Sequence, residues 1–349
     1  MKSMTTNKRV RGEEGIAAIL IAMFIMIILT LITLGFARIM RREQRQALDS
    51  SLTTQAFYAA ESGINDAISA INSGALTTDI NTCVSASFPN RTVSATQNAS
   101  YSCLLVDQTP SNLEYNQGSI TANRSTVIPI EASVPGQYFK TLTISWSSDD
   151  TAPHSFRRCT DTLLDTVSNW TGDTGLLRFD LVPIVTSSGN TVTRDSPGGL
   201  IDSTMSAYLN PAKSSCAGNS PINFASGTSN QGRIYTEHCN VGNTPRDCNM
   251  TINLPSTVHK YMLRVKSMYH NSNMTITGTD TSDANVSFFG AQKQIDSTGK
   301  VSDVVRRLQV RVPSKQVPVP EYVVQSMDGI CKQLDVAPAP SPTADNNCP

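Results

Sequence analysis

The chain has little of what most enzyme active sites are built from. Its 349 residues include only four histidines, and charged residues make up 16% of it. We find no GxSxG motif, no phosphate-binding glycine loop and no CxxC pair, so nucleophilic, nucleotide-dependent and zinc chemistry lack their usual motifs. A charged fraction below the roughly 25% of ordinary soluble domains, with a net charge of zero, argues against a broad basic face for nucleic acid. We therefore expect no enzyme and no cofactor.

The zero net charge hides a segregation of charge along the chain. Residues 1–46 hold eight basic and three acidic groups, a charge of +5, which leaves −5 for the remainder. Within this basic end, residues 16–37 (IAAILIAMFIMIILTLITLGFA) contain no charge. A helix of that length spans about 33 Å, close to the roughly 30 Å of a bilayer's hydrocarbon core. The sequence therefore predicts a transmembrane helix over 16–37.

A secretory signal peptide is the competing interpretation of this segment. The apolar stretch is too long for one, and arginines rather than small residues follow it. We expect the helix to stay attached and to be followed by a basic collar at the membrane exit, formed by Arg38, Arg41, Arg42 and Arg45. The collar either binds anionic lipid headgroups or is a solvated stop-transfer segment, and both interpretations stay open.

The helix is expected to continue beyond the membrane as an amphipathic segment over 38–73. No proline interrupts it, and Gly74 is placed to end it as a C′ glycine. Two rows of side chains recur at helical spacing. The large row is expected to pack on a globular domain and contains Leu48, Leu52, Phe57, Ile64, Ile68 and Ile71. The small row would permit close approach of another helix or a sheet and contains Ala56, Ala60, Gly63 and Ala67. The alternative is an ordinary amphipathic helix with alanine chosen for propensity.

These features together carry a family resemblance. A basic leader ending RGEEG, an apolar stretch from the next residue, a basic patch and the phrase QAFYAAESGINDAI resemble the N-terminal region of type IV pilin-like proteins, closest to minor pilins of the PilX type. The resemblance covers roughly residues 8–72. It implies a leader peptide, 1–15, that a prepilin peptidase removes by cutting between Gly15 and Ile16. Gly12 is the alternative cleavage site, but a cut there would leave two carboxylates ahead of the membrane segment. It also implies that the apolar helix leaves the bilayer to pack against other pilin subunits.

The chain departs from the family at one position. Many pilins carry a glutamate at the fifth residue of the mature chain, and this position is Leu20 here. The departure favours a rare subunit, at a tip or an initiating position, over an ordinary shaft subunit.

Beyond Gly74, short alternating runs separated by Gly, Pro, Asn and Ser predict a β-rich body over 74–312. We expect an α+β fold in which an antiparallel sheet packs on the amphipathic half of the long helix. Loops are expected over 187–230, a hairpin turn at 296–300, and an extended linker with a Pro-rich tail over 313–349. The predicted strands cover residues 138–146, 176–185, 261–268, 274–277, 286–295 and 304–312.

All the cysteines lie in this body, and their number is even. They are Cys83, Cys103, Cys159, Cys216, Cys239, Cys248, Cys331 and Cys348. An even count behind a membrane helix predicts disulfides in an oxidising compartment, which places the body outside the cytoplasm. Sequential pairing is expected because 83 with 103, 239 with 248 and 331 with 348 would close short loops. Reduced buried thiols are the alternative.

Three ligand sites are weaker alternatives. His238, Cys239, Cys248 and His259 would supply a zinc site, but their spacing matches no known zinc motif. Asp280, Asp283 and Asn285 would supply calcium ligands, but polar turn residues explain them better. Arg306, Arg307 and Arg311 would supply a nucleic-acid contact, but arginines also suit any amphipathic strand.

The leading hypothesis is a minor type IV pilin or pseudopilin with a cytoplasmic N-terminus and a body on the cell surface. Its partners would be other pilin subunits, the prepilin peptidase and, before assembly, the lipid bilayer. Nucleic acid is an unlikely partner, and the sequence names no surface ligand. The alternative is an anchored surface adhesin or receptor that never enters a filament, and an extracytoplasmic enzyme comes third.

Overall fold

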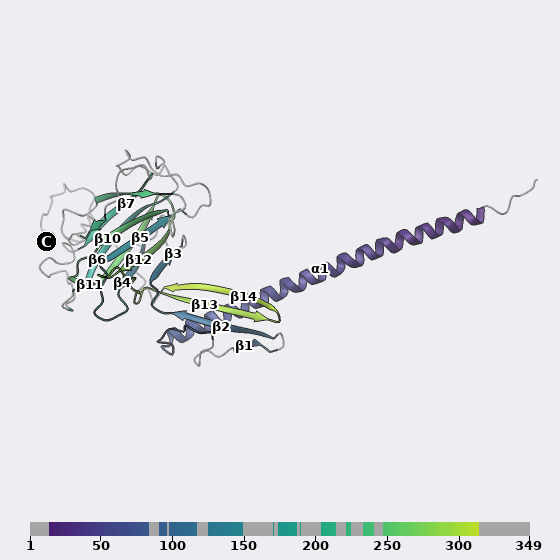
Figure 1. The fold of residues 1–349 in the computed structure, drawn as a ribbon, viewed down its shortest axis with the longest axis horizontal. Helices are drawn as coiled ribbons and strands as arrows, with labels where there is room; N and C mark the ends of the chain where they lie inside the picture. The colour runs from purple at the N-terminus through teal and green to yellow at the C-terminus, as the bar shows by residue number, and fades with distance from the viewer. Residues whose placement is uncertain are drawn as a thin grey trace, which may run out of the picture. The chain divides into compact units, whose positions relative to one another are not determined.

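The computed structural model describes residues 14–83, 91–95, 98–116, 125–148, 170, 174–186, 189, 204–213, 221–224, 233–240 and 247–313. These residues form one helix, α1, and fourteen strands (Figure 1). They divide into two compact units. The helix–sheet unit runs to Leu76 and adds Thr82–Leu105 and Asp296–Gln309. The sandwich unit holds Thr77–Asn81, Val106–Ile295 and the chain from Val310 onward.

Helix α1 spans Glu14–Asn72 without a break, which confirms the predicted continuous helix over about 16–73. It ends as the sequence predicts. Gly74 has a φ of 75°, its N–H donates to the Ile71 carbonyl at 3.2 Å, and the Leu76 N–H donates to the Ala70 carbonyl at 3.1 Å. A glycine with positive φ that satisfies the last carbonyls is a typical helix C-cap.

The helix–sheet unit adds a four-stranded sheet in the order β1-β2-β13-β14. Its strands are β1 (Arg91–Ser94), β2 (Ala99–Asp107), β13 (Gln292–Val301) and β14 (Val304–Pro313). Figure 1 shows the C-terminal half of α1 running alongside these strands, while its N-terminal half extends beyond them.

The sandwich unit consists of two five-stranded sheets, in the orders β3-β12-β5-β10-β8 and β4-β11-β6-β7-β9. Most neighbours pair antiparallel, whereas β10–β8 and β7–β9 pair parallel. The first sheet contains β3 (Asn112–Tyr115), β5 (Thr141–Ser147), β8 (Ile222–Asn223), β10 (Cys248–Asn253) and β12 (Asn273–Thr279). The second contains β4 (Ser125–Glu131), β6 (Leu176–Thr186), β7 (Met205–Lys213), β9 (Arg233–Cys239) and β11 (Val258–Met268).

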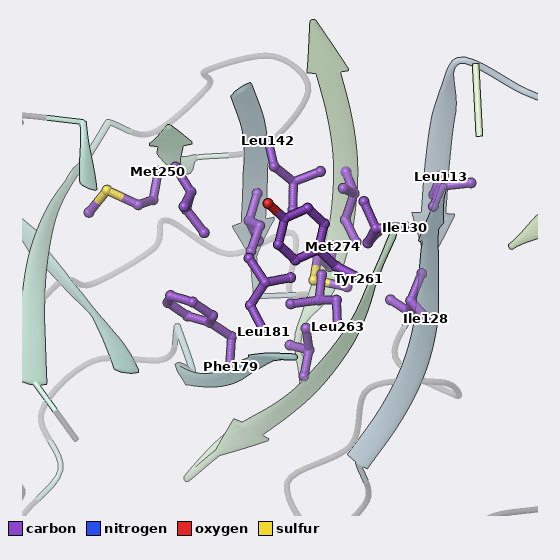
Figure 2. Packing of buried hydrophobic residues seen from close by; sticks show 14 of the residues in the cluster. Leu113, Ile128, Ile130, Leu142, Phe179, Leu181, Met250, Tyr261, Leu263 and Met274 are labelled. Atoms are coloured by element: carbon purple, nitrogen blue, oxygen red, sulfur yellow. The ribbon is translucent and has the colours of Figure 1, made fainter. Parts of the chain in front are cut away.

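One hydrophobic core joins the two sheets of this unit. Alternate residues of the strands point inward, so Leu142 of β5, Phe179 of β6 and Leu263 of β11 are fully buried in a single cluster. Figure 2 shows side chains of both sheets gathered in this cluster, with the Tyr261 ring near its centre. Antiparallel sheets with one apolar and one polar face pack in this way.

The α+β class is confirmed, and the helix packs on an antiparallel sheet. Three details of the predicted body are wrong. Residues 296–300 lie inside β13, and the chain turns at Ser302, which has a φ of 52°. The strand predicted over 286–295 begins only at Gln292. Strands β7 and β8 lie within 187–230, where loops were predicted.

The strand that the loop prediction missed, β7, has the sequence MSAYLNPAK. Its inward side chains Met205, Ala207 and Leu209 are all fully buried. Asn210 and Pro211 interrupt the alternating pattern of this strand, so its sequence resembles that of a loop. The segment is a strand because it pairs with β6 and β9 in the sandwich, and not because its residues favour strands locally.

Candidate functional site

The N-terminal half of α1 is apolar on all sides and uncovered. From Ile19 to Phe36 its large side chains are exposed, and the helix is long and apolar enough to cross a membrane. A helix that is hydrophobic all round belongs in lipid or in a protein core, and none of this stretch is buried in the chain itself. Leu20, which stands where the resemblance to pilins would lead one to expect a glutamate, is one of these exposed apolar side chains.

The two threonines within the apolar half satisfy their hydroxyls inside the helix. Thr30 donates to the Ile27 carbonyl at 2.8 Å, and Thr33 lies 2.9 Å from the carbonyls of Leu29 and Thr30. No hydroxyl of these two residues therefore needs water, which is what a lipid environment requires. Gly15 and Ile16 lie within α1, and their side chains are outside the described residues.

The basic collar occupies one face of the helix. Arg38, Arg41, Arg42 and Arg45 are all exposed and recur at i, i+3, i+4 and i+7, which is the spacing of one helix face. Among the residues that the structure describes, none is an ion-pair partner of these arginines. The face of α1 that contacts the four-stranded sheet includes Ala56, Ala59, Ala60 and Gly63. Each arginine precedes one of these residues by 18 positions, or five whole turns. The collar and the four-stranded sheet therefore lie on the same side of α1.

The sheet-contacting face is built from small residues. Ala56, Ala60 and Ala67 are fully buried, and the backbone of β13 comes so close that a Cβ at Gly299 would lie 2.0 Å from the Ala56 carbonyl oxygen. On the helix, a Cβ at Gly63 would lie 2.4 Å from the Ser297 Oγ. The predicted close approach along the small row is confirmed, and its partner is a sheet. Sequence reasoning missed Ala59, which is 1% exposed, and Gly299.

The large row is only partly a packing face. Ile64 is buried, and Leu52, Ile68 and Ile71 are half-buried at its edges. The prediction is wrong for Leu48 and Phe57, which are 63% and 44% exposed. Close helix–sheet contact leaves room only for small side chains along its centre, so large ones are displaced to the flanks or to solvent.

A polar cluster fixes the helix against β2 beside this contact. Asp66 of α1 accepts a hydrogen bond from the Tyr101 hydroxyl at 2.9 Å. It also forms an ion pair with Arg91, at 3.4 Å. Burial, followed by the hydrogen bond to Asp66, raises the pKa of Tyr101 to about 12. The charged Asp66 thus helps to keep Tyr101 protonated. No motif signals these three residues in the sequence.

Two disulfides confirm part of the predicted pairing. Cys83 bonds Cys103 in the helix–sheet unit, and Cys239 bonds Cys248 in the sandwich unit. Reduced thiols are therefore the wrong interpretation for these four residues, and the second bond removes Cys239 and Cys248 from the imagined zinc site. The other four cysteines, Cys159, Cys216, Cys331 and Cys348, lie outside the described residues.

The remaining ligand candidates have structural roles. Asp280 Oδ1 accepts hydrogen bonds from the Ser282 N–H and hydroxyl and from the Ala284 N–H, which is an Asx-type turn. These hydrogen bonds lower the pKa of Asp280. Asp283 pairs with Lys140 at 2.8 Å. Among the described residues no group of three or more His, Cys, Asp or Glu side chains could hold a metal ion.

The arginines of β14 also have partners within the chain. Arg307 pairs with Asp296 through two donors, and this contact raises the pKa of Arg307. Arg311 donates to the Asn112 carbonyl at 2.8 Å and to Glu114 at 3.0 Å. Arg306 reaches the Thr53 hydroxyl at 3.4 Å. Each of the three arginines therefore has a partner within the chain.

The fold and this helix define a class of protein. One candidate membrane helix near the N-terminus, followed by a disulfide-bonded β-rich body, indicates a membrane-anchored chain whose body lies outside the cytoplasm. Comparison with protein-family models, with curated proteins and with solved structures finds no match to the chain.

Proposed function

We propose that the chain is a minor type IV pilin or pseudopilin, a structural subunit of a pilus-like filament. The observation that carries the proposal is the composition of α1. One continuous helix of 59 residues has a first half suited to lipid or to a bundle of like helices. Its second half is held on a four-stranded sheet by a row of small residues. Such a helix can pass from bilayer to filament core without refolding, because its body is attached only to the second half.

The arrangement of charge on α1 supports lateral packing from one side. The collar and the four-stranded sheet share one face, so the opposite face carries neither the arginines of the collar nor that sheet. That face includes the small residues Ala47, Ser51 and Thr54, which are exposed, and it continues with the exposed Tyr58 and Glu61. Small side chains allow close approach between helices. Neighbouring subunits would approach α1 there.

Leu20 and the sandwich unit support a special position in the filament. The exposed apolar side chain of Leu20 cannot pair with a neighbour's free amine as a glutamate would. Residues 106–295, which include both sheets of the sandwich, form one long excursion between β2 and β13. A shaft subunit must repeat around the filament, whereas a tip subunit can carry a large extra unit at its exposed end.

Processing of the leader is the first test. In cells with an active prepilin peptidase, we expect sequencing of the mature N-terminus to begin at Ile16. Gly15→Leu should leave the leader in place, because a bulky side chain would occupy the narrow position at the cut. Gly12→Ala, a substitution three residues away, should be processed as the wild type is. A wild-type chain that still begins at Met1 would contradict the proposal.

Fractionation distinguishes the proposal from its alternative, a surface adhesin or receptor anchored by α1 that never enters a filament. The long exposed apolar half of α1 fits both. A filament subunit should appear in filaments sheared from the cells, together with other pilins. An anchored adhesin should remain with the membrane fraction after shearing, in amounts that do not depend on the presence of other pilin subunits.

A further inference from the structure

The outer face of the sheet β4-β11-β6-β7-β9 carries a cluster of positive charge that no part of the preceding account uses. Leu263 and Val265 of β11 point into the core, so the alternating residues Arg264 and Lys266 face outward and are half-buried. Arg178 projects from the adjacent strand β6 and is exposed. These three residues are called the basic patch below, and all belong to the sandwich unit.

The patch places like charges opposite each other. Lys266 of β11 and Arg178 of β6 are direct cross-strand partners, and Arg264 is the partner of Asp180. Side chains opposite each other on one sheet face have Cβ atoms about 4.5–5.5 Å apart, and like charges at that distance are destabilising. On the same face Asp180 pairs with Arg178, so one carboxylate offsets only part of this positive charge and leaves a place for an external anion.

The counter-charge on this face is incomplete. Asp180 pairs with Arg178 at 3.4 Å and also accepts a hydrogen bond from the Ser206 hydroxyl. Among the residues that the structure describes, Arg264 and Lys266 have no ion-pair or hydrogen-bond partner. Three cations therefore share one carboxylate, a local charge of +2 in a chain whose residues after 46 carry −5.

The surroundings of the patch define the kind of anion. The Arg178 guanidinium lies over the Tyr208 ring, 5.9 Å from its centroid, and Tyr208 is the cross-strand partner of Arg178 on β7. Lys266, Arg178 and Tyr208 thus form a straight row across three strands, about 10 Å long at the usual strand spacing. This face of the sheet therefore presents three kinds of group together. They are the cations, the pair Asp180 and Ser206, which can bind hydroxyl groups, and the face of the Tyr208 ring.

We propose that this face binds a linear polysaccharide that carries carboxylate groups. Its carboxylates would pair with Lys266 and Arg264, its hydroxyls would hydrogen-bond Asp180 and Ser206, and the C–H face of a sugar ring would lie against Tyr208. Single-stranded DNA fits less well, because its backbone has no free hydroxyl groups to donate to Asp180, whereas a polyuronate carries hydroxyls between its carboxylates. The proposal does not depend on filament assembly, since an anchored adhesin would present the same face.

The test measures binding of the full chain in detergent to alginate oligosaccharides, a linear polyuronate, at low salt. Neutral dextran and single-stranded DNA serve as comparison ligands. We expect the wild type to bind alginate and not dextran, and Arg178→Gln combined with Lys266→Gln to weaken binding at least tenfold. The matched control, Lys300→Gln combined with Arg306→Gln, removes the same charge from the helix–sheet unit and should bind as the wild type does.

Thermal unfolding without ligand separates a binding role from a structural one. The Arg178→Gln, Lys266→Gln variant should melt at or above the wild-type temperature, because removing both facing like charges abolishes their repulsion. Several results would overturn the proposal: no binding of alginate by the wild type, equal binding of dextran, equal loss in the control variant, or unfolding of the patch variant at lower temperature. Tighter binding of single-stranded DNA than of alginate, with the same dependence on the patch, would assign the face to nucleic acid instead.

Discussion

Gly299 shows how one residue determines the distance between helix and sheet. An added Cβ would lie 2.0 Å from the Ala56 carbonyl oxygen and 2.5 Å from the Ala60 nitrogen. Both are backbone atoms of α1, so no side-chain rotation can relieve the clash. We expect Gly299→Ala to lower the free energy of unfolding by about 3 kcal/mol, at the upper end of overpacking effects. Urea unfolding checks this value. Lys300→Ala, an exposed neighbour on the same strand, should change it by less than about 0.5 kcal/mol, and equal stability of both variants would contradict the close contact.

Because of Tyr101, the helix–sheet unit should lose stability at alkaline pH. Its pKa rises from 10.0 to about 12 in the folded chain, so the folded state holds the hydroxyl proton more tightly than the unfolded state. The resulting stability is fully present below pH 10 and is lost as the pH rises toward 12. In urea unfolding at pH 9 and pH 11.5, the wild type should lose more stability than Tyr101→Phe, which has no proton to release. An equal loss in both proteins would show that burial and the bond to Asp66 do not raise the pKa of Tyr101 in the folded chain.

At the scale of the element, the small row of α1 packs on the sheet, whereas part of the large row is exposed. Ala60 is fully buried against the sheet, whereas Phe57, three residues away, is 44% exposed. We expect Ala60→Leu to destabilise the helix–sheet unit by about 1–3 kcal/mol, because the sheet leaves no space for extra methylenes. Phe57→Ala should change the unfolding free energy by less than about 0.5 kcal/mol. Thermal unfolding of the two variants measures the difference. A larger loss of stability in Phe57→Ala than in Ala60→Leu would show that the large row is the packing face after all.

The same contrast shows which parts of the helix could be predicted from the sequence. Helix length and end follow from local features, namely the absence of proline and the position of Gly74, and both were predicted correctly. The choice of packing face depends on how close the sheet comes. That distance is determined by Gly63 on the helix and Gly299 on β13, which are 236 positions apart in the chain. A hydrophobic pattern alone ranks Leu48 and Phe57 above alanine and so selects the wrong centre for the contact.

Gly299 also explains the misplaced hairpin turn. A glycine among Asp, Ser, Thr and Lys is typical of a turn, but here the glycine serves a close approach in the middle of β13. The true turn at Ser302 has no glycine and adopts a positive φ with an ordinary side chain. The cross-strand basic patch was missed for a related reason. Neither Lys266 nor Arg178 is unusual alone, and only the register of β11 with β6 brings them together.

At the scale of the whole molecule, the sandwich unit is an insertion into the helix–sheet unit. The chain leaves the four-stranded sheet after β2 and returns as β13, and these two strands are neighbours in that sheet. The Ser102 hydroxyl on β2 donates to the Thr298 carbonyl on β13 at 3.3 Å. The disulfide Cys83–Cys103 and the contact of Gly299 with α1 also involve only residues of the helix–sheet unit. The contacts that hold α1 to the sheet are therefore present without the sandwich.

This topology predicts that the sandwich can be removed while the helix–sheet unit stays folded. A chain in which residues 108–291 are replaced by a short Gly-Ser linker should join β2 to β13 as a hairpin, since a hairpin is the ordinary connection between adjacent antiparallel strands. We expect cooperative thermal unfolding of this shortened chain, protection of Cys83 and Cys103 from alkylation until a reductant is added, and retention in sheared filaments if the proposed function holds. Cys83→Ser with Cys103→Ser in the same background should cost about 3 kcal/mol, because the bond closes a loop of 20 residues. A shortened chain that is unfolded in detergent would show that α1 and its sheet depend on the inserted unit, whereas a folded chain that is absent from filaments would place the assembly contacts in the sandwich.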